Sequence, residues 1–307
     1  MMDKKNRIRL DEAKRTFRII FDSPLGTLGL IIILIFVLIT IFANVIAPHN
    51  PYEIDIFNKL QPPSKNHFFG TDQAGRDIFS RVLYGSRYSL FAGLIVVVIG
   101  VTVGTSVGLT SGYPGNKRGE LLMRVTDIFF AFPTLVLAIA LAATMGPSFV
   151  NSMIAISLVY WPKYARLVYG QSLSIKENDF IKFAETLREK KRKIRLKHIL
   201  PNCISVLIVQ ATLDFGEAIL FFASLSFIGL GAQPPAPDWG AMVSISRGYM
   251  MVSWWMAVFP GLAIFFVVMG FNLLGDSLRD AFDPQLRRLK AYKPLRFSLV
   301  KRIFKKN

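Results

Sequence analysis

Six long apolar runs constrain what this chain can fold into. A helix rises about 1.5 Å per residue, so roughly 20 apolar residues cross the ~30 Å hydrocarbon layer of a membrane. The short alternating strands of a membrane barrel are absent from the sequence. We therefore predict an all-α polytopic membrane protein with six transmembrane helices. The expected spans are Thr27–Ala47, Ser89–Ser111, Ile128–Met145, Val150–Tyr169, Ile204–Leu230 and Val252–Gly275.

The basic residues are distributed unevenly between the runs. Lys and Arg number 37 against 20 Asp and Glu, a net charge of +17 that in a soluble protein would suggest a nucleic-acid partner. Cytoplasmic loops of membrane proteins carry an excess of Lys and Arg. We predict cytoplasmic N- and C-termini, contact with membrane lipid and no nucleic-acid partner. Of the 37, 29 fall in residues 1–26, 112–126, 171–203 and 276–307, and six in 48–88 and 231–251.

The cytoplasmic segment 179–202 is longer than the roughly 2–8 residues that usually join two membrane helices. Its first half predicts a short helix capped by Asn178 or Asp179, and a second helical pattern, Ile194–Leu200, is expected to stop at Pro201. We interpret this hairpin as a docking element that transmits movement into the membrane. The apolar residues of the first helix share one face: Phe180, Phe183, Ala184 and Leu187.

Two acidic residues lie inside the fifth run. Asp214 is about 15 Å along the helix, near the membrane midplane, and Glu217 shares its face three residues later. A charge there costs ~2.5–3.5 kcal/mol and usually faces a wet cavity or a partner. Two interpretations stay open: the acids line a translocation path, or they are a protonated or hydrogen-bonded pair buried between helices.

Other residues of the runs predict how the helices pack and bend. Pro133 and Pro162 are expected to bend the third and fourth helices. Lys163 and Arg166 fall in the last two turns of the fourth run and are expected to reach the cytoplasmic headgroups. Glycine at every fourth position of the second run predicts a stripe of close helix contact: Gly100, Gly104, Gly108 and Gly112.

The outer segment 48–88 is rich in turn-forming residues. Within it, the stretch after Gly70 fits a short helix on the membrane surface, capped near Thr71 or Asp72. The residues favour a simpler interpretation, a capped entry to the second membrane helix, over a gate or a rim for an outer partner.

The residue inventory disfavours an enzyme and a metal protein. Cys203 is the one cysteine, and the three histidines, His49, His67 and His198, are far apart in sequence, so we expect isolated side chains and no metal site. No phosphate-binding G-x-x-x-x-G-K-[ST] loop and no hydrolase motif occurs. A transporter with this sequence needs an ion gradient or another subunit as its energy source.

The hairpin resembles the cytoplasmic "EAA" loop of binding-protein-dependent ABC importer permeases. From Thr27 to Leu286 the chain resembles the second permease subunit of the dipeptide, oligopeptide and nickel importers. The matching stretches are FGTDQAGRDIFSRVLYGSR, YWPKYARLVYGQSLS, RLKHILPN, ASLSFIGLGAQPPAPDWG and NLLGDSLRDAFDPQLR.

That resemblance implies a type I importer permease in the bacterial plasma membrane. Its transmembrane domain would span 87–276, after a cytoplasmic segment 1–26 and an N-terminal portion 27–86, and before a basic cytoplasmic tail 277–307. The implied partners are a homologous permease in a heterodimer, two cytoplasmic ABC ATPases and an extracytoplasmic substrate-binding protein. ATP and Mg would bind to the ATPases, and this chain would hold no cofactor.

The resemblance also implies which residues couple the chain to an ATPase. Lining up Pro201 places Lys182 and Phe183 where the family has Glu and Ala, and Arg188 where it has Gly. Phe222 replaces an acidic residue that usually precedes ASLSF. The coupling positions are Asp179, Phe180, Ile181, Lys182, Phe183, Ala184, Glu185, Leu187, Arg188, Ile199, Leu200 and Pro201.

Three functions are compared on these grounds. An ABC importer permease for di- and oligopeptides explains both the hairpin and the buried acids, with a nickel chelate or another small solute as the alternative cargo. A proton-coupled secondary transporter using Asp214 and Glu217 predicts internal repeats, and none is clear. A membrane scaffold explains neither the hairpin nor the buried acids.

Overall fold

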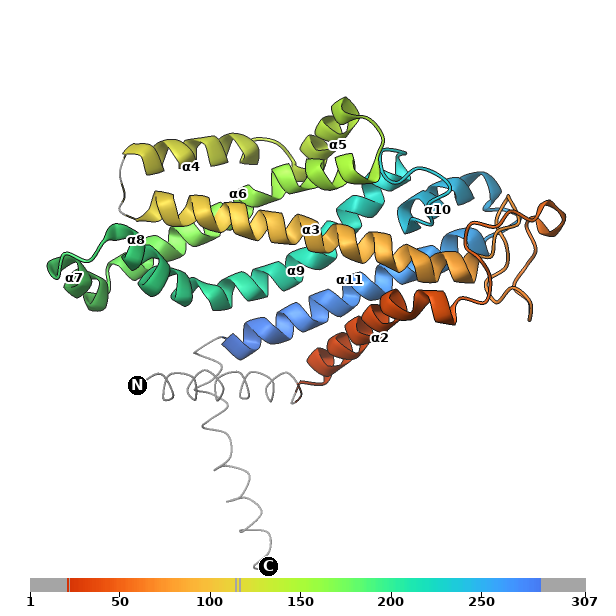
Figure 1. Cartoon of the computed structure of the whole chain (residues 1–307), viewed down its shortest axis with the longest axis horizontal. Helices are drawn as coiled ribbons and strands as arrows, with labels where there is room; N and C mark the ends of the chain where they lie inside the picture. Colours follow the sequence, from red (N-terminus) through yellow and green to blue (C-terminus); the bar gives the residue numbers. More distant parts are fainter. Residues whose placement is uncertain (1–20, 22, 114, 116, 283–307) are drawn as a thin grey trace, which may run out of the picture.

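The computed structural model describes residues 21–282 except 22, 114 and 116, and it is an elongated bundle of helices (Figure 1). Most of the predicted N-terminal segment 1–26 and of the tail 277–307 lies outside the described residues. The prediction that both termini are cytoplasmic concerns these residues and stays a prediction. The helices are α2 (Pro24–Ile46), α3 (Ile78–Gly112), α4 (Lys117–Phe130), α5 (Thr134–Met145), α6 (Phe149–Lys176), α7 (Asp179–Thr186), α8 (Lys191–Lys193), α9 (Leu200–Phe227), α10 (Trp239–Ser246) and α11 (Trp255–Phe282). Single turns at Ile56–Asn58 and Arg247–Tyr249 and a π-helical segment at Ile194–Ile199 complete the described elements.

The all-helical prediction is confirmed for the described part of the chain, which contains an isolated bridge between Thr71 and Asp77 and no strand. Four described helices are long and apolar enough to cross a membrane, or five if a bent pair counts as one span. The fourth expected span, Val150–Tyr169, corresponds to α6, which has a spanning length of 28 residues but does not reach the apolar character of the four spanning helices.

The third expected span is not one helix. It divides into the end of α4 and all of α5, which meet at an angle of 88°. Pro133 lies at this break and caps the start of α5. Proline cannot donate a backbone hydrogen bond and disfavours a helical residue before it, so the chain turns here instead of bending gently.

The outer stretch before the second span forms no separate surface helix. Asp77 caps α3 by accepting a 2.8 Å hydrogen bond from the backbone N–H of Ser80, and the helix then continues for 35 residues. The simpler interpretation, a capped entry to the membrane helix, is therefore confirmed, and the expected cap at Thr71 or Asp72 is wrong. Asp72 instead folds the loop, because its Oδ1 accepts from the backbone N–H groups of Ala74 and Arg76.

The glycine stripe of α3 packs against α6, as the four-residue spacing predicts. A Cβ atom at Gly104 would lie 2.4 Å from the carbonyl oxygen of Trp161, and one at Gly108 would lie 2.6 Å from that of Ala165. No larger residue fits these two positions without moving a backbone. The stripe therefore sets how closely α3 and α6 approach.

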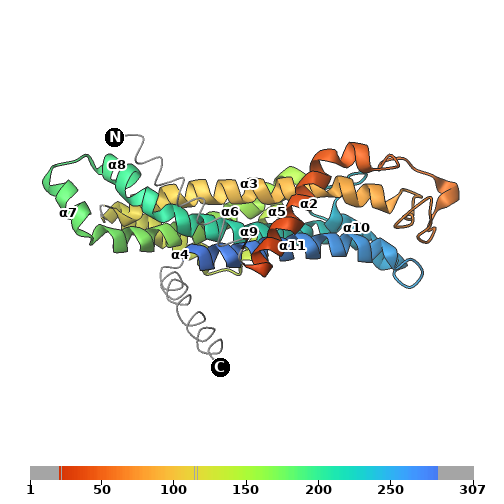
Figure 2. The same ribbon diagram turned by 90° about the horizontal axis from the view of Figure 1, so that it is seen from below.

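The bundle has two different ends (Figures 1 and 2). The hairpin of α7 and α8 forms one end, and the loop 47–77 together with α10 forms the other. One buried apolar cluster joins α3, α6 and α9 and extends into the base of the hairpin through Ile181 and Ile194. A second cluster joins the start of α3 to α10 and α11 around Trp239 and Trp255.

Candidate functional site

The hairpin presents an apolar face to the outside. Among its residues, Ile181 is fully buried and Ala184 is 6% exposed, and both pack into the core cluster. Another side of α7 and its C-cap residue carry large apolar side chains that remain 47%, 65% and 66% exposed, namely Phe180, Phe183 and Leu187. The predicted apolar face is thus correct for these three residues, and Ala184 belongs to the buried side.

A left-handed residue closes the turn after α7. Arg188 has φ +54°, the conformation that a glycine adopts without strain. The helix ends at Thr186 and is not lengthened by the arginine, which adopts a conformation that favours glycine. Beyond the turn, the carboxylate of Glu189 pairs with Lys193 and lies 2.7 Å from Nε2 of His198.

Pro201 begins a helix instead of ending one. Residues Ile194–Ile199 form a π-helical segment that leads directly into α9, and Pro201 occupies the first turn of α9. Proline is tolerated there because the first N–H groups of a helix have no partner within it. The hairpin is therefore joined to a membrane helix without a loop. Ile199 is fully buried at this junction.

The other coupling positions anchor the hairpin or lie on its surface. Asn178 occupies the N-cap position of α7, but neither its side chain nor that of Asp179 caps the helix. Nζ of Lys182 lies 3.7 Å from a carboxylate oxygen of Glu177, and both side chains are exposed. Burial and the nearby carboxylate of Glu185 raise the pKa of the Tyr113 hydroxyl at the end of α3.

A second candidate site lies in the middle of the bundle, where a lysine joins the two buried acids. Nζ of Lys163 donates to Oδ1 of Asp214 at 2.6 Å and to Oε2 of Glu217 at 2.9 Å. The side chain of Asp214 is 1% exposed, and those of Lys163 and Glu217 are each 43% exposed. Nε2 of Gln210 also donates to Oδ1 of Asp214, at 2.9 Å.

This ionic triad corrects the prediction that Lys163 and Arg166 reach the headgroups. The fourth helix was expected to end at Tyr169, but α6 continues to Lys176, so Lys163 lies near its middle. At that depth the nearest partners of its ammonium group are the carboxylates of α9. Arg166, one turn later, pairs with Asp127 at the end of α4. The sequence contained a signal for this pairing, because Lys163 lies in the run that precedes the one holding Asp214 and Glu217.

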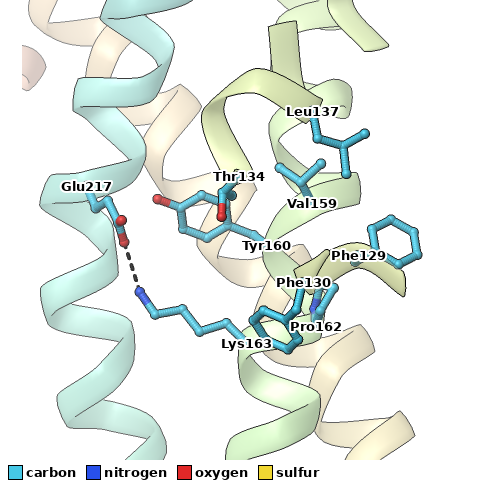
Figure 3. A pocket seen from close by; sticks show the side chains of 9 residues that line it. All are labelled: Phe129, Phe130, Thr134, Leu137, Val159, Tyr160, Pro162, Lys163 and Glu217. Atoms are coloured by element: carbon cyan, nitrogen blue, oxygen red, sulfur yellow. Dashed lines mark hydrogen bonds and ion pairs between the residues drawn. The ribbon is translucent and has the colours of Figure 1, made fainter. Parts of the chain in front are cut away.

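The triad opens onto a cavity of about 190 Å³ between α4, α5, α6 and α9. Figure 3 shows Lys163 extending from α6 across this space to Glu217, with Tyr160 and aromatic side chains beside them. Asp214 is buried and does not line the cavity. The residues that line the cavity are Phe129, Phe130, Thr134, Leu137, Val159, Tyr160, Pro162, Lys163 and Glu217.

The other residues that the sequence analysis singled out lie outside the hairpin and the ionic triad. Phe222, in place of the family's acid, is fully buried and its ring meets that of Phe149 edge to face. The expectation of isolated histidines is wrong for two of them, because His49 and His67 lie side by side with ring centroids 4.8 Å apart. Asp77 is hydrogen-bonded to His67.

Residues 100–288 match the family described as "Binding-protein-dependent transport system inner membrane component". Residues 13–63 match the "N-terminal TM domain of oligopeptide transport permease C".

Among individual proteins, the chain is 46% identical over 263 residues to the "Probable D,D-dipeptide transport system permease protein DdpC" of Escherichia coli (strain K12), covering 86% of this chain and 88% of that one. It is 46% identical to the "Dipeptide transport system permease protein DppC" of Alkalihalophilus pseudofirmus, over 89% and 90% of the two chains. It is also 46% identical to the "Glutathione transport system permease protein GsiD" of Escherichia coli O157:H7, over 85% and 86%.

A solved structure supports the fold. An inward-facing structure of the MetNI methionine ABC transporter superposes with a TM-score of 0.56 at 17% identity, covering 67% of this chain and 98% of that one. The matches extend over most of the sequence, from the N-terminal span through the hairpin to the last helix. This chain belongs to the family of inner membrane components of binding-protein-dependent transport systems.

Proposed function

We propose that this protein is the transmembrane permease subunit of an ATP-driven importer of di- or oligopeptides. The observation that carries the proposal is the exposed apolar face of α7, Phe180, Phe183 and Leu187, held at the end of the bundle by buried neighbours. A monomer gains nothing by exposing three large apolar side chains on a short helix in water, so this face fits a partner groove. Relatives named for dipeptide and glutathione transport support the cargo class.

The partner for that face is a cytoplasmic ABC ATPase. ATP and Mg bind to two such subunits, a homologous permease forms the other half of the membrane pathway, and an extracytoplasmic binding protein delivers the cargo. This chain performs no covalent chemistry. Its location is the bacterial plasma membrane, with the hairpin on the cytoplasmic side, which the placement of Lys and Arg supports.

Movement passes from the hairpin into the membrane along α9. The helical segment from Lys191 to Phe227 contains both the base of the hairpin and the two acids, without an intervening loop. A displacement of α7 therefore shifts Asp214 and Glu217 relative to Lys163 on α6. Alternating access is a shift of population between states in which these groups are differently arranged.

The ionic triad supplies the groups that a zwitterionic peptide recognises. A peptide ammonium group can replace Lys163 at the half-exposed Glu217, and a peptide carboxylate can pair with Lys163. The aromatic walls of the cavity accommodate apolar peptide side chains. Asp214 stays buried against Gln210 and keeps the lysine in position. These roles for Asp214 and Glu217 are part of the proposal.

Purification through an affinity tag, mass spectrometry of the bound chains and uptake by proteoliposomes test this function. We expect a second permease and ABC ATPases to co-purify, and labelled peptide to enter only with ATP and the binding protein. Uptake driven by a proton gradient with no ATPase would contradict the proposal and favour secondary transport. ATP-driven uptake of a nickel chelate but not of peptide would keep the permease and replace its cargo.

Lys163→Met tests the path separately from the docking face. The variant leaves Asp214 buried beside Gln210 with no lysine, and we expect peptide uptake to fall at least tenfold while the ATPase subunits still co-purify. Arg124→Met is the matched control, because Arg124 pairs with Glu120 on an exposed surface. Unchanged uptake by Lys163→Met would remove the triad from the path.

A further inference from the structure

A group of metal-ligating side chains lies at the loop end of the bundle, away from both sites described above. His49, His67 and Asp77 each offer one ligand atom, and these atoms lie within 4.8 Å of one another. Among the described residues no other group of His, Cys, Asp and Glu meets this condition. The proposed function assigns no role to it.

Two of the ligand atoms lie close to the spacing of a coordinated pair. Nδ1 of His67 lies 2.9 Å from Oδ1 of Asp77. Two atoms bonded to one tetrahedral ion at about 2.1 Å are about 3.4 Å apart. An ion can therefore take the place of the shared proton once the two atoms separate by about half an ångström. Asp77 is 3% exposed and fixed at the start of α3.

The third ligand completes the site by a rotation. Nε2 of His49 now lies 2.8 Å from the carbonyl oxygen of Asn66, and its exposed ring is free to turn toward His67. Its backbone N–H donates to Oγ of Ser80. The backbone N–H of Ser80 in turn donates to Oδ2 of Asp77. Ser80 thus fixes both His49 and Asp77, as outer partners of metal ligands do.

We propose that His49, His67 and Asp77 form a binding site for a borderline divalent transition-metal ion, with Zn²⁺ as its best representative. Two imidazoles and one carboxylate suit Zn²⁺, Ni²⁺ and related ions, whereas Ca²⁺ and Mg²⁺ prefer oxygen ligands. The exposed side of His49 leaves the remaining coordination positions to water. The ion ties both ends of the loop between residues 49 and 67 to the cap of α3.

The competing account is a plain hydrogen bond between His67 and Asp77 that holds the loop without an ion. A substitution of His49 distinguishes the metal site from the plain hydrogen bond, because the ring of His49 makes no hydrogen bond to His67 or Asp77 when no metal is bound. His49→Gln therefore removes a ligand while leaving the His67–Asp77 bond in place. His198→Gln is the matched control, since His198 is the third histidine of the chain and lies at the hairpin end beside Glu189.

The test uses the intact permease complex, purified through a tag without histidine and stripped with a chelator. Equilibrium dialysis against Zn²⁺ followed by elemental analysis gives the ions bound per complex. We expect wild type and His198→Gln to bind one ion more than His49→Gln, and His49→Gln to require at least tenfold more Zn²⁺. Zn²⁺ should also raise the melting temperature of wild type and His198→Gln, and not that of His49→Gln.

Equal Zn²⁺ binding and equal melting shifts in wild type and His49→Gln would overturn the proposal and leave the hydrogen bond as the whole account. His67→Gln distinguishes the two further. It lowers the metal-free melting temperature in either case, but Zn²⁺ restores none of that loss if the site needs His67. Neither readout depends on transport, so the result stands apart from the proposed function.

Discussion

The two ends of the bundle differ in which side chains they bury: the loop end buries charged side chains, and the hairpin end exposes large apolar ones. At the loop end, Arg81 is 2% exposed, its Nη1 donates to the carbonyl oxygen of Pro51 at 2.8 Å, and its Nε lies 3.7 Å from Asp72. At the hairpin end, Phe183 and Leu187 are about two-thirds exposed. The buried charges of the loop end are paired within this chain. The exposed apolar face of the hairpin end is not covered by any described residue.

The difference explains how one helical bundle serves two tasks. A network of buried charges fixes a loop in one conformation, because any opening exposes unpaired groups. An apolar face on a short helix has no such internal partner and is stabilised when a groove covers it. Mutations at the two ends should therefore separate stability from coupling.

The largest effect is expected from Asp72→Asn. Oδ2 of Asp72 accepts from Nε of Arg76 at 2.7 Å, and Asn keeps the oxygen that the backbone N–H groups use. The change leaves two buried arginines without a counter-charge, and breaking such a pair costs about 3–5 kcal/mol. We expect a large fall in the melting temperature of the purified complex. Glu53→Gln, an exposed acid of the same loop, should change stability by less than about 0.5 kcal/mol.

Phe183→Ala should affect assembly instead of stability. Aromatic residues at the centre of an interface contribute about 2 kcal/mol or more, so we expect at least a tenfold loss of ATPase retention during purification. The melting temperature of the permease should stay unchanged because Phe183 is 65% exposed. Phe57→Ala, 97% exposed at the loop end, is the control and should retain the ATPases. Equal retention by both variants would end the distinction between the two ends.

One acid at each end, Asp238 and Glu189, should make stability depend on pH in opposite directions. Burial raises the pKa of Asp238, the cap of α10, to about 6. The pKa of this carboxyl group is higher in the folded chain than in the unfolded chain. The protonated carboxyl group therefore stabilises the fold at low pH, and this stabilisation is lost as pH rises from about 4 to 6. The hydrogen bond from Lys193 lowers the pKa of Glu189, and that contribution is lost as pH falls.

Asp238→Asn tests this sign directly. Asn keeps the cap, since its oxygen can still accept from the N–H of Ala241, and it carries no charge to bury. The variant should gain melting temperature over wild type at pH 7.5, and the gain should shrink at pH 4.5. Glu189→Gln should lose more at pH 7.5 than at pH 4.5. A gain for Asp238→Asn that does not vary with pH would contradict the assignment.

The smallest effect concerns the backbone. Each end holds one non-glycine residue at φ +54°, Leu60 and Arg188, and these are the two found among the described residues. Arg188→Gly relieves a left-handed strain of roughly 1–2 kcal/mol and adds roughly 0.5–1 kcal/mol of backbone entropy cost. Its net effect should be a stabilisation between about zero and about 1.5 kcal/mol.

Leu60→Gly should differ in sign, because Leu60 also packs against the second apolar cluster. Loss of that packing outweighs the relief of strain. Melting temperatures of the two variants, measured side by side, check the contrast. A higher melting temperature for Leu60→Gly than for wild type would show that the loop end is strained and not packed.

The spans show why some predictions succeeded. Apolar runs of about 20 residues and glycine at every fourth position are local signals, and they predict helices and the α3–α6 contact before any fold is known. Helix ends are harder to predict, because the polar last turns of α6 resemble a loop. That error moved Lys163 from the middle of a helix to its end and concealed its pairing with Asp214 and Glu217.

The sequence by itself determined the helical membrane class and the apolar face of the hairpin, since each depends on residues close together in the chain. Only the tertiary structure decided the partners of charged groups. Lys163 meets Asp214 51 residues away, and Arg81 donates to Pro235 154 residues away. A buried charge pairs with the groups that helix packing places next to it. No local sequence pattern predicts partners that are so far away along the chain.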